Sequence, residues 1–190
     1  MRLSVLICGI TKRLASLKAL IDELTTQSLA IHETVEVLAI VDNKTIIIGD
    51  KRNRLVRIAG GDYVVFIDDD DWIAEDYLYQ IIRLIDAGQP DVVTFPVEVT
   101  LDGGPPKPCY YAIGYPDQGE DDKSYWRWPN HLCVIRRDLV LQHPYPPIAF
   151  GEDTAFATGI RPHLKTELAF THHPLYYYRF STQHSAVIKP

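Results

Sequence analysis

Four consecutive aspartates, Asp68 to Asp71, directly follow the apolar run 63–67 and are the residues best suited to chemistry. Carboxylates this close repel one another unless a cation lies among them. Oxygen ligands favour a hard ion such as Mg²⁺ or Mn²⁺ over zinc. No basic residue stands between positions 62 and 76, so we expect a metal ion to neutralise this aspartate cluster. The alternative is an acidic turn that caps the next helix, a role that Asp71 alone would fill.

A basic segment lies just before the aspartates. Against the single acid Asp50, residues 44–57 hold five basic side chains: Lys44, Lys51, Arg52, Arg54 and Arg57. Lysine and arginine near a helix start suit a phosphate, although a solvated helix face is the simpler alternative. A basic segment beside an acidic one can hold an anion and a metal ion together. The absence of G-x-G-x-x-G and of G-x-x-x-x-G-K-[ST] disfavours a Rossmann cofactor and a P-loop NTPase.

A second pair of acids, Glu152 and Asp153, follows Gly151 where a helix is expected to begin. Such a pair either caps the helix or supplies a general base, and the residues alone leave both open. His131 lies beside other candidate site residues, where a histidine is more often structural. The adjacent histidines 172 and 173 are expected to point to opposite sides of a strand, an arrangement that does not favour a shared metal ion.

The spacing of apolar residues predicts an α/β fold. Continuous apolar runs predict strands and i, i+3, i+4 stripes predict helices. We expect helices over 13–28, 50–60, 74–87 and 154–160, and strands over 3–8, 35–41, 63–67, 92–95, 132–135, 166–170 and 175–180. Strand–helix–strand repeats indicate a parallel sheet with helices on both faces, and the unbroken apolar runs fit strands covered on both sides.

Residues 102–130 depart from this pattern. They are rich in glycine and proline and carry six tyrosines and tryptophans, among them Trp126 and Trp128. Glycine and proline disfavour regular structure, so we expect a shaped binding loop; the alternative is a mobile surface insertion.

Composition narrows the class of protein. The chain has 190 residues, 46% hydrophobic and 23% charged, which predicts a single globular domain over 1–190. A net charge of −6 makes a general nucleic-acid coat unlikely, because phosphate binding needs a cationic surface. Three cysteines without a C-x-x-C disfavour a disulfide framework or zinc cluster and suggest a reducing cytoplasm. No apolar stretch approaches the length of a membrane span, and the N-terminal run is too short for a signal peptide.

Several segments together resemble glycosyltransferase family 2, the large inverting group with the GT-A fold. Residues 3–7 resemble its first strand and residues 37–43 its second strand with a nucleoside-facing aspartate. The stretch Lys51-Arg52-Asn53 and then 59–71 is similar to the core "RN…A.GEYI.FLD.DD". Residues 151–153 resemble the E-D motif and 176–179 the terminal "YYYR" strand. Two departures are 8–11, where the family usually has Pro-Thr-Tyr-Asn, and 181–185, which replaces its His-x-x-Ser with a segment that includes His184.

The resemblance implies a nucleotide-diphospho-sugar transferase fold with a mostly parallel central sheet and helices on both faces. It implies a nucleotide-sugar-binding half over 1–100 and an acceptor-side half over 101–190. By position in the motifs, Asp68 and Asp70 would hold Mn²⁺ or Mg²⁺ on the donor's diphosphate. The donor, a UDP-sugar, would also be met by Asp69, Asp42, Lys51, Arg52 and Arg57. Asp153 would be the base and Glu152 would lie near the sugar or acceptor.

The acceptor implied by the family is most often a saccharide. The compact form and the segment 129–137 resemble small soluble phage-type members, for which a hydroxymethylated base in phage DNA is an alternative acceptor and the host cytoplasm the location. Trp126, Trp128 and His131 are the acceptor-side candidates, since aromatic rings stack on a flipped base. Two other functions remain open: a nucleotidyltransferase making a nucleotide sugar, for which 9–13 is a poor loop, and a non-catalytic nucleotide-sugar binder.

Overall fold

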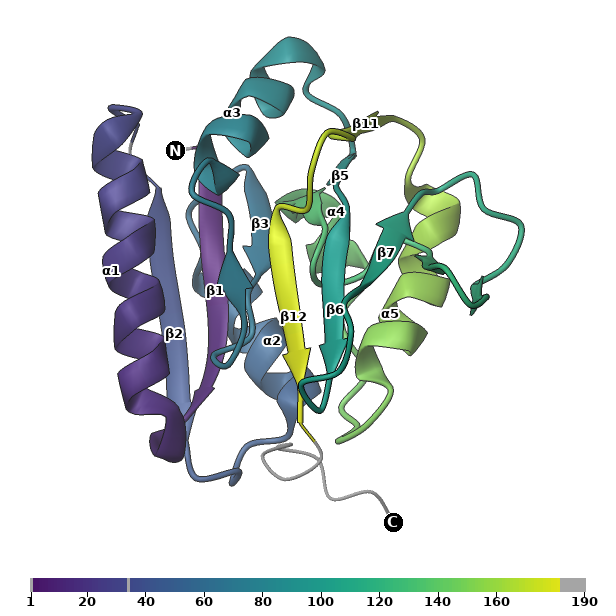
Figure 1. Cartoon of the computed structure of the whole chain (residues 1–190). Coiled ribbons are helices and arrows are strands. Elements are labelled where there is room, and N and C mark those ends of the chain that lie inside the picture. The colour runs from purple at the N-terminus through teal and green to yellow at the C-terminus, as the bar shows by residue number, and fades with distance from the viewer. Residues whose placement is uncertain (1, 34, 182–190) are drawn as a thin grey trace.

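The computed structural model describes residues 2–33 and 35–181, so His184 and its neighbours lie outside the described residues. The first sheet has the order β11-β5-β10-β3-β1-β2. Its N-terminal part consists of β1 (Leu3–Ile10), β2 (Glu36–Asp42) and β3 (Tyr63–Phe66), which are parallel. The connections carry η1 (Thr11–Arg13), α1 (Leu14–Ala30) and α2 (Ile48–Ile58). In Figure 1, α1 and β2 form one side of the molecule.

Helices cover both faces of this sheet, as the apolar runs predict. On one face, Leu3, Val5 and Ile7 of β1 pack with α1 and with α3 (Tyr77–Gly88). On the other face, Leu6 and Cys8 pack with α2, α4 (Arg137–Gln142) and α5 (Glu152–Ile160). Because successive side chains of a strand point to opposite faces, a strand covered on both sides has no polar alternation.

The first sheet is mostly parallel, as expected from the sequence, and one strand makes it mixed. β5 (Val92–Thr94) and β11 (Glu167–Ala169) are parallel, but β10 (Val134–Arg136) runs antiparallel between β3 and β5. The chain leaves β5 at the carboxyl end of the sheet, builds a second sheet and returns at that same end. A strand that re-enters from this end must run in the opposite direction.

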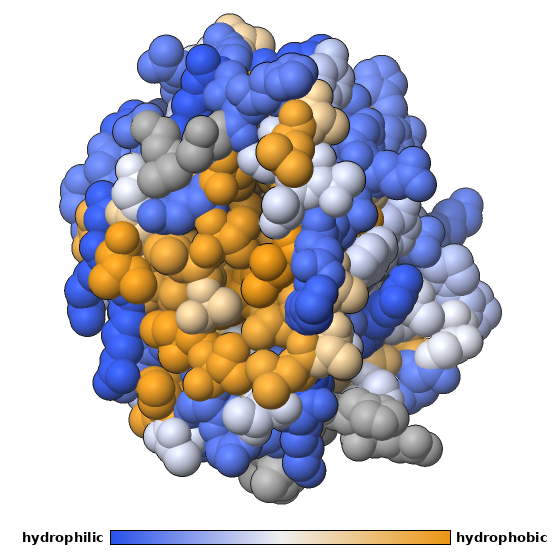
Figure 2. Space-filling model, turned by 90° about the vertical axis from the view of Figure 1, so that its left-hand side faces the viewer, coloured by the Kyte–Doolittle hydropathy of each residue, from blue (hydrophilic) through white to orange (hydrophobic). Residues whose placement is uncertain are grey.

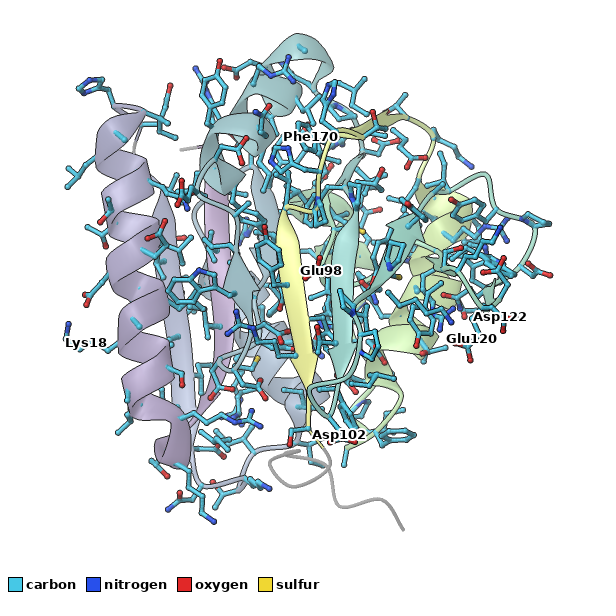
Figure 3. All side chains as sticks on the ribbon, in the orientation of Figure 1. Lys18, Glu98, Asp102, Glu120, Asp122 and Phe170 are labelled. Atoms are coloured by element: carbon cyan, nitrogen blue, oxygen red, sulfur yellow. The ribbon has the colours of Figure 1, made fainter. Side chains whose placement is uncertain are left out.

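A second six-stranded sheet has the order β4-β12-β6-β7-β9-β8. Its strands are β4 (Trp72–Ile73), β6 (Val97–Leu101), β7 (Lys107–Tyr111), β8 (Gly119–Glu120), β9 (Tyr125–Arg127) and β12 (Tyr176–Phe180). The expectation that 102–130 lacks regular structure is therefore wrong. Its glycines and prolines fall mainly in turns and irregular segments, such as Gly103, which has a positive φ like Asp102 before it. Its aromatic residues supply much of β7 and β9. Figure 3 shows Glu120 and Asp122 at the outer end of this sheet, and Lys18 at the opposite side of the molecule on α1.

The site lies on the side of the molecule where strands of both sheets end. Figure 1 shows the arrowheads of β1, β6 and β12 on the same lower side of the molecule. Side chains that follow β1 and β3 therefore lie next to the strands of the second sheet. The expectation that His172 and His173 lie on a strand is wrong, because both follow the end of β11. Within 2–33 and 35–181 no helix is long and apolar enough to cross a membrane.

Candidate active site

The aspartate cluster, Asp68–Asp71, alternates between accessible and buried side chains. The side chains of Asp68 and Asp70 are 27% and 33% exposed. Asp69 and Asp71, by contrast, are only 2% and 5% exposed. The D-x-D pair singled out from the sequence is therefore the accessible half of the cluster.

The two buried aspartates bind the cluster to neighbouring segments of the chain. Asp69 accepts hydrogen bonds from the backbone N–H of Ile10, at 2.8 Å, and from Arg13, at 2.9 Å. Asp71 accepts from the hydroxyl of Tyr176 and from the backbone N–H of Arg179, both at 2.7 Å. A helix-capping role for Asp71 is wrong, because α3 begins at Tyr77 and Asp71 instead fastens β12 to the cluster. The carboxylate of Asp69 likewise bonds to its own chain, whereas the resemblance implies that it contacts the donor.

Basic side chains surround the cluster, contrary to the expectation from the local sequence. Arg13 contacts Asp69 and also Asp70, at 2.8 Å. Arg52 lies 3.5 Å from one oxygen of Asp68, and His131 lies 3.6 Å from the other. Carboxyl ends of adjacent parallel strands meet at one edge, so η1 after β1 comes beside the loop after β3. The neutralising charges come from segments distant in sequence.

Negative charge still exceeds positive charge here. Burial, opposed by Arg13 and reinforced by the charges of Asp68 and Asp69, raises the pKa of Asp70 to about 6. Burial also raises the pKa of Asp71 well above its usual range. Burial alone would raise the pKa of Asp68 too, but His131 and Arg52 hold it below its usual range. An additional cation near Asp70 would relieve this repulsion.

Arg52 joins the cluster to the second pair of acids. Its side chain is almost fully buried, with Nε 3.3 Å from Glu152 and Nη2 3.5 Å from Asp68. The guanidinium carbon lies 4.8 Å from the centre of the Phe66 ring, a cation–π distance. Arg52 thus ties α2, the end of β3 and the start of α5 together. Glu152 and Asp68 take Nε and Nη2 of Arg52, while its Nη1 has no hydrogen-bond partner among the described residues.

Asp153 lies at the same site but remains partly exposed. Gly151, with φ of 77°, turns the chain into α5, and Asp153 is the second residue of that helix. Tyr178 of β12 connects the two acidic groups electrostatically. Burial and then the charges of Asp68, Asp71, Asp70 and Asp153 raise the pKa of its hydroxyl. Because Arg52 contacts both Asp68 and Glu152, the structure brings the E-D pair and the aspartate cluster together.

Comparison with known proteins identifies the family. The model of Glycosyl transferase family 2 matches residues 48–156, more than half of the chain. The chain belongs to this family. No curated protein matches it. The fold agrees with two solved structures: Staphylococcus aureus TarS 1-349 (TM-score 0.68, 18% identity, 94% of this chain and 60% of that one) and the catalytic domain of Drosophila β1,4-galactosyltransferase 7 in complex with xylobiose (0.55, 14%, 94% and 65%). The GT-A fold expected from the resemblance is thus confirmed, while no comparison shows a phage-type relative.

Asp42, Lys51 and Arg57 of this family-2 domain do not converge on the cluster. Lys51 is buried and contacts Asp42 at 2.5 Å and the carbonyl of Gly9 at 3.0 Å. Asp42 also accepts from Thr45 and Ile46; these bonds outweigh burial and lower its pKa. Arg57 is exposed in the last turn of α2, about 9 Å along the helix from Lys51. Lys51 and Asp42 shape the turn after β2, and Arg57 lies at the opposite end of α2 from Lys51.

The three acceptor-side candidates, Trp126, Trp128 and His131, lie in two different places. Trp126 donates to Asp117 at 3.0 Å, and Trp128 donates to the carbonyl of Tyr115 at 2.9 Å. Arg161 lies 4.4 Å from the Trp128 ring centre, so one face of that ring is covered. His131 belongs instead to the cluster. It is buried beside Asp68, and neither ring nitrogen has a hydrogen-bond partner among the described residues.

Three further residues enter the site that were not among the candidate site residues from the sequence: Arg13, Tyr176 and Tyr178. Tyr176 donates to Asp71 and accepts from the backbone N–H of Asp68 at 3.0 Å. The tyrosines had a detectable pattern, since they belong to the terminal strand that resembles the family motif. Arg13 had none, because a basic residue after the first strand is common on any helix start.

Proposed function

We propose that this chain transfers a sugar from a UDP-sugar to an acceptor hydroxyl with inversion at the anomeric carbon. The observation that carries the proposal is that Arg52 joins accessible Asp68, which is followed by accessible Asp70, to Glu152, the neighbour of the partly exposed Asp153. Membership of glycosyl transferase family 2 supports it. TarS, which shares the fold at 18% and 16% identity, has been solved with UDP and with UDP-GlcNAc. The chain spans about 60% of those proteins, so the donor is carried over as part of the proposal.

The residues present fit a divalent ion held by Asp68 and Asp70. Five carboxylates, Asp68–Asp71 and Glu152, meet two guanidinium groups, Arg13 and Arg52, which leaves surplus negative charge. Among the described residues, no three acidic, histidine or cysteine side chains are arranged to hold a metal ion. Magnesium-type sites often combine one or two carboxylates with substrate phosphates, and we propose that arrangement here. When bound, the ion would offset the charge of the leaving diphosphate.

Asp153 takes the proton from the acceptor hydroxyl in this proposal. Glu152 is unsuited to that role because it is buried and paired with Arg52. Asp153 follows it on the same helix, and its side chain is partly exposed. A hydroxyl activated there attacks the face of the sugar opposite the diphosphate, which inverts the anomeric centre. The half 1–100 would hold the donor and the half 101–190 would present the acceptor.

A saccharide is the acceptor that the surface favours over a base in DNA. Trp126 and Trp128 are both tied to their own chain by their indole N–H groups, and Arg161 covers one face of Trp128. Anchored rings are poorly placed to sandwich a flipped base. The net charge of −6 also opposes a phosphate backbone.

Donor turnover is the test. The chain is incubated with UDP-glucose, UDP-galactose or UDP-GlcNAc, Mn²⁺ and a panel of saccharides, and UDP release and products are measured. We expect UDP release and a glycosylated product of inverted configuration, both lost in Asp153→Asn. A parallel reaction with UTP and sugar 1-phosphate that made a nucleotide sugar would contradict the proposal. Absence of turnover with every donor, while UDP still binds, would identify a non-catalytic binder instead.

A further inference from the structure

The outer edge of β2 is an open strand edge. β2 ends the first sheet and pairs with β1, and no other described strand pairs with it. It is seven residues long, and none of its side chains is fully buried. Unpaired N–H and C=O groups on a long apolar edge are a template for another strand. The opposite edge, β11, is three residues long and offers much less.

Apolar surface continues around this edge. Figure 2 looks onto the side formed by α1 and β2 and shows a broad hydrophobic area facing the viewer. Side chains of β2 are partly exposed, and large aliphatic side chains are exposed on flanking segments: Leu29 (71%), Ile47 (43%) and Ile58 (64%). A monomeric protein rarely exposes a continuous apolar area of more than a few hundred Å², and larger ones mark interaction sites.

The usual protections of an edge strand are missing from β2. Natural edges carry lysine, proline or free charges that block pairing. Residues 35–41 contain no lysine or proline, and Glu36 is turned to its own chain, where it accepts from Ser4 at 2.6 Å and Gly60 at 2.8 Å. Asp42 is likewise paired with Lys51. The edge is therefore apolar and open along its length.

The order of residues in β2 identifies the partner that fits. The strand reads Glu-Val-Leu-Ala-Ile-Val-Asp, and the same residue classes recur from either end around Ala39. Two copies paired antiparallel about a twofold axis at Ala39 would place Val37 opposite Val41 of the partner subunit, and Leu38 opposite Ile40 of the partner subunit. Such aliphatic pairs stabilise a sheet. A twofold interface requires a self-complementary surface, which the aliphatic residues 37–41 supply. At the ends of the strand Glu36 faces Asp42 of the partner subunit, and both acids are already bonded within their own chains.

We propose that the chain forms a twofold dimer through antiparallel pairing of β2 with β2 of a second copy. The first sheet then continues across the dimer. A specific interface buries about 800 Å² per partner, more than one strand supplies, so the exposed ends of α1 and α2 that carry Leu29 and Ile58 also take part. This inference does not depend on sugar transfer.

Measurement of the mass in solution tests the dimer. At roughly 100 µM, where a complex of micromolar affinity is nearly all formed, we expect twice the 21.6 kDa of the chain. Ala39→Lys places like charges opposite each other and should weaken the dimer at least about tenfold. The matched control is Ala169→Lys, an exposed alanine on the opposite edge strand β11, which should not change the mass. A monomeric wild type, or an Ala39→Lys variant that dimerises as tightly as wild type, overturns the proposal.

A cross-linking experiment tests the register. The native cysteines, Cys8, Cys109 and Cys133, are all buried, so an introduced thiol is the reactive one. In the proposed pairing the two introduced Cβ atoms are about 4.5–5.5 Å apart, close to disulfide range. Mild oxidation should convert Ala39→Cys to a covalent dimer and leave Ala169→Cys monomeric on a denaturing gel. Equal cross-linking of both variants would place the contact elsewhere.

Discussion

The aspartate cluster and the Glu152–Asp153 pair share one arrangement of acidic side chains. In each, one acidic side chain is buried and fastened to the fold, while its neighbour in sequence is accessible. Asp69 and Asp71 are fastened by Arg13, Tyr176 and backbone N–H groups, and Glu152 by Arg52. Asp70 and Asp153 remain more exposed. In both places, therefore, the buried acid holds the site in position and its accessible neighbour is free to act on substrate. The predictions below test this division of roles.

The largest effect is expected at Asp153. Asp153→Asn keeps the size and the helix-capping ability of the side chain but cannot accept a proton. Transfer should fall by about 10²–10⁴-fold, the usual contribution of a general base, while UDP affinity and melting temperature stay near wild type. Single-turnover rates and thermal unfolding measure the two properties. If Asp153→Asn turns over at nearly the wild-type rate, the base lies elsewhere.

Glu152→Gln is the matched variant at the buried acid of this pair. It removes the charge that pairs with buried Arg52 and should lower stability as well as rate. If Glu152→Gln lost transfer but kept full stability, Glu152 would act in the reaction, and the division into a structural and a catalytic acid would not hold for this pair.

Removal of the Asp70 carboxylate, one of the two accessible ones in the cluster, should weaken metal-assisted donor binding. With two carboxylates and no third chain ligand among the described residues, Mn²⁺ should bind weakly alone and tightly with UDP. Asp70→Asn should lower the UDP affinity measured with Mn²⁺ at least about tenfold, because even residues behind metal ligands contribute 10–100-fold. Calorimetric titration with and without EDTA measures this. Full activity of the wild type in excess EDTA would contradict it.

A fastened aspartate should act on stability. Asp71→Ala leaves the buried hydroxyl of Tyr176 and the N–H of Arg179 without their acceptor. The expected cost is about 1–3 kcal/mol of unfolding free energy, the usual penalty for an unsatisfied buried group. Asp70→Ala is the control, and because it removes a like charge it should cost little. Urea denaturation compares the two, and equal losses would mean that the cluster acts as one unit.

The sequence was informative where the site is local. The Asp68–Asp71 run and the Glu152–Asp153 pair are contiguous, so their acidity and their positions beside expected elements could be predicted without a fold. Buried strands and the α3 stripe were predictable for the same reason, since their periodicity is local.

Contacts between distant segments could not be predicted in this way. Arg52 reaches Glu152 across 100 positions, and Arg13 reaches Asp69 across 56. Both depend on which strands become neighbours. The second sheet was missed because strands such as β8 and β9 have two or three residues, too few to show a period, and lie among glycines and prolines. Pairing between segments, not local propensity, makes them strands.

The smallest effect is expected at a carboxylate outside the site. Asp76 accepts from His173 at 3.0 Å and from Gln80 at 2.8 Å on the surface. Burial alone would raise its pKa, but these partners together lower it below its usual range. A lowered pKa means that the stabilisation is present above the unfolded pKa near 3.8 and is lost as the pH falls through the folded value. Exposed pairs of this kind contribute about 0–1 kcal/mol, so Asp76→Asn should shift unfolding at pH 7 by less than 1 kcal/mol and leave transfer intact. A loss as large as that of Asp71→Ala would show that partners alone, without burial, make a carboxylate structural, and would remove the distinction on which the comparison depends.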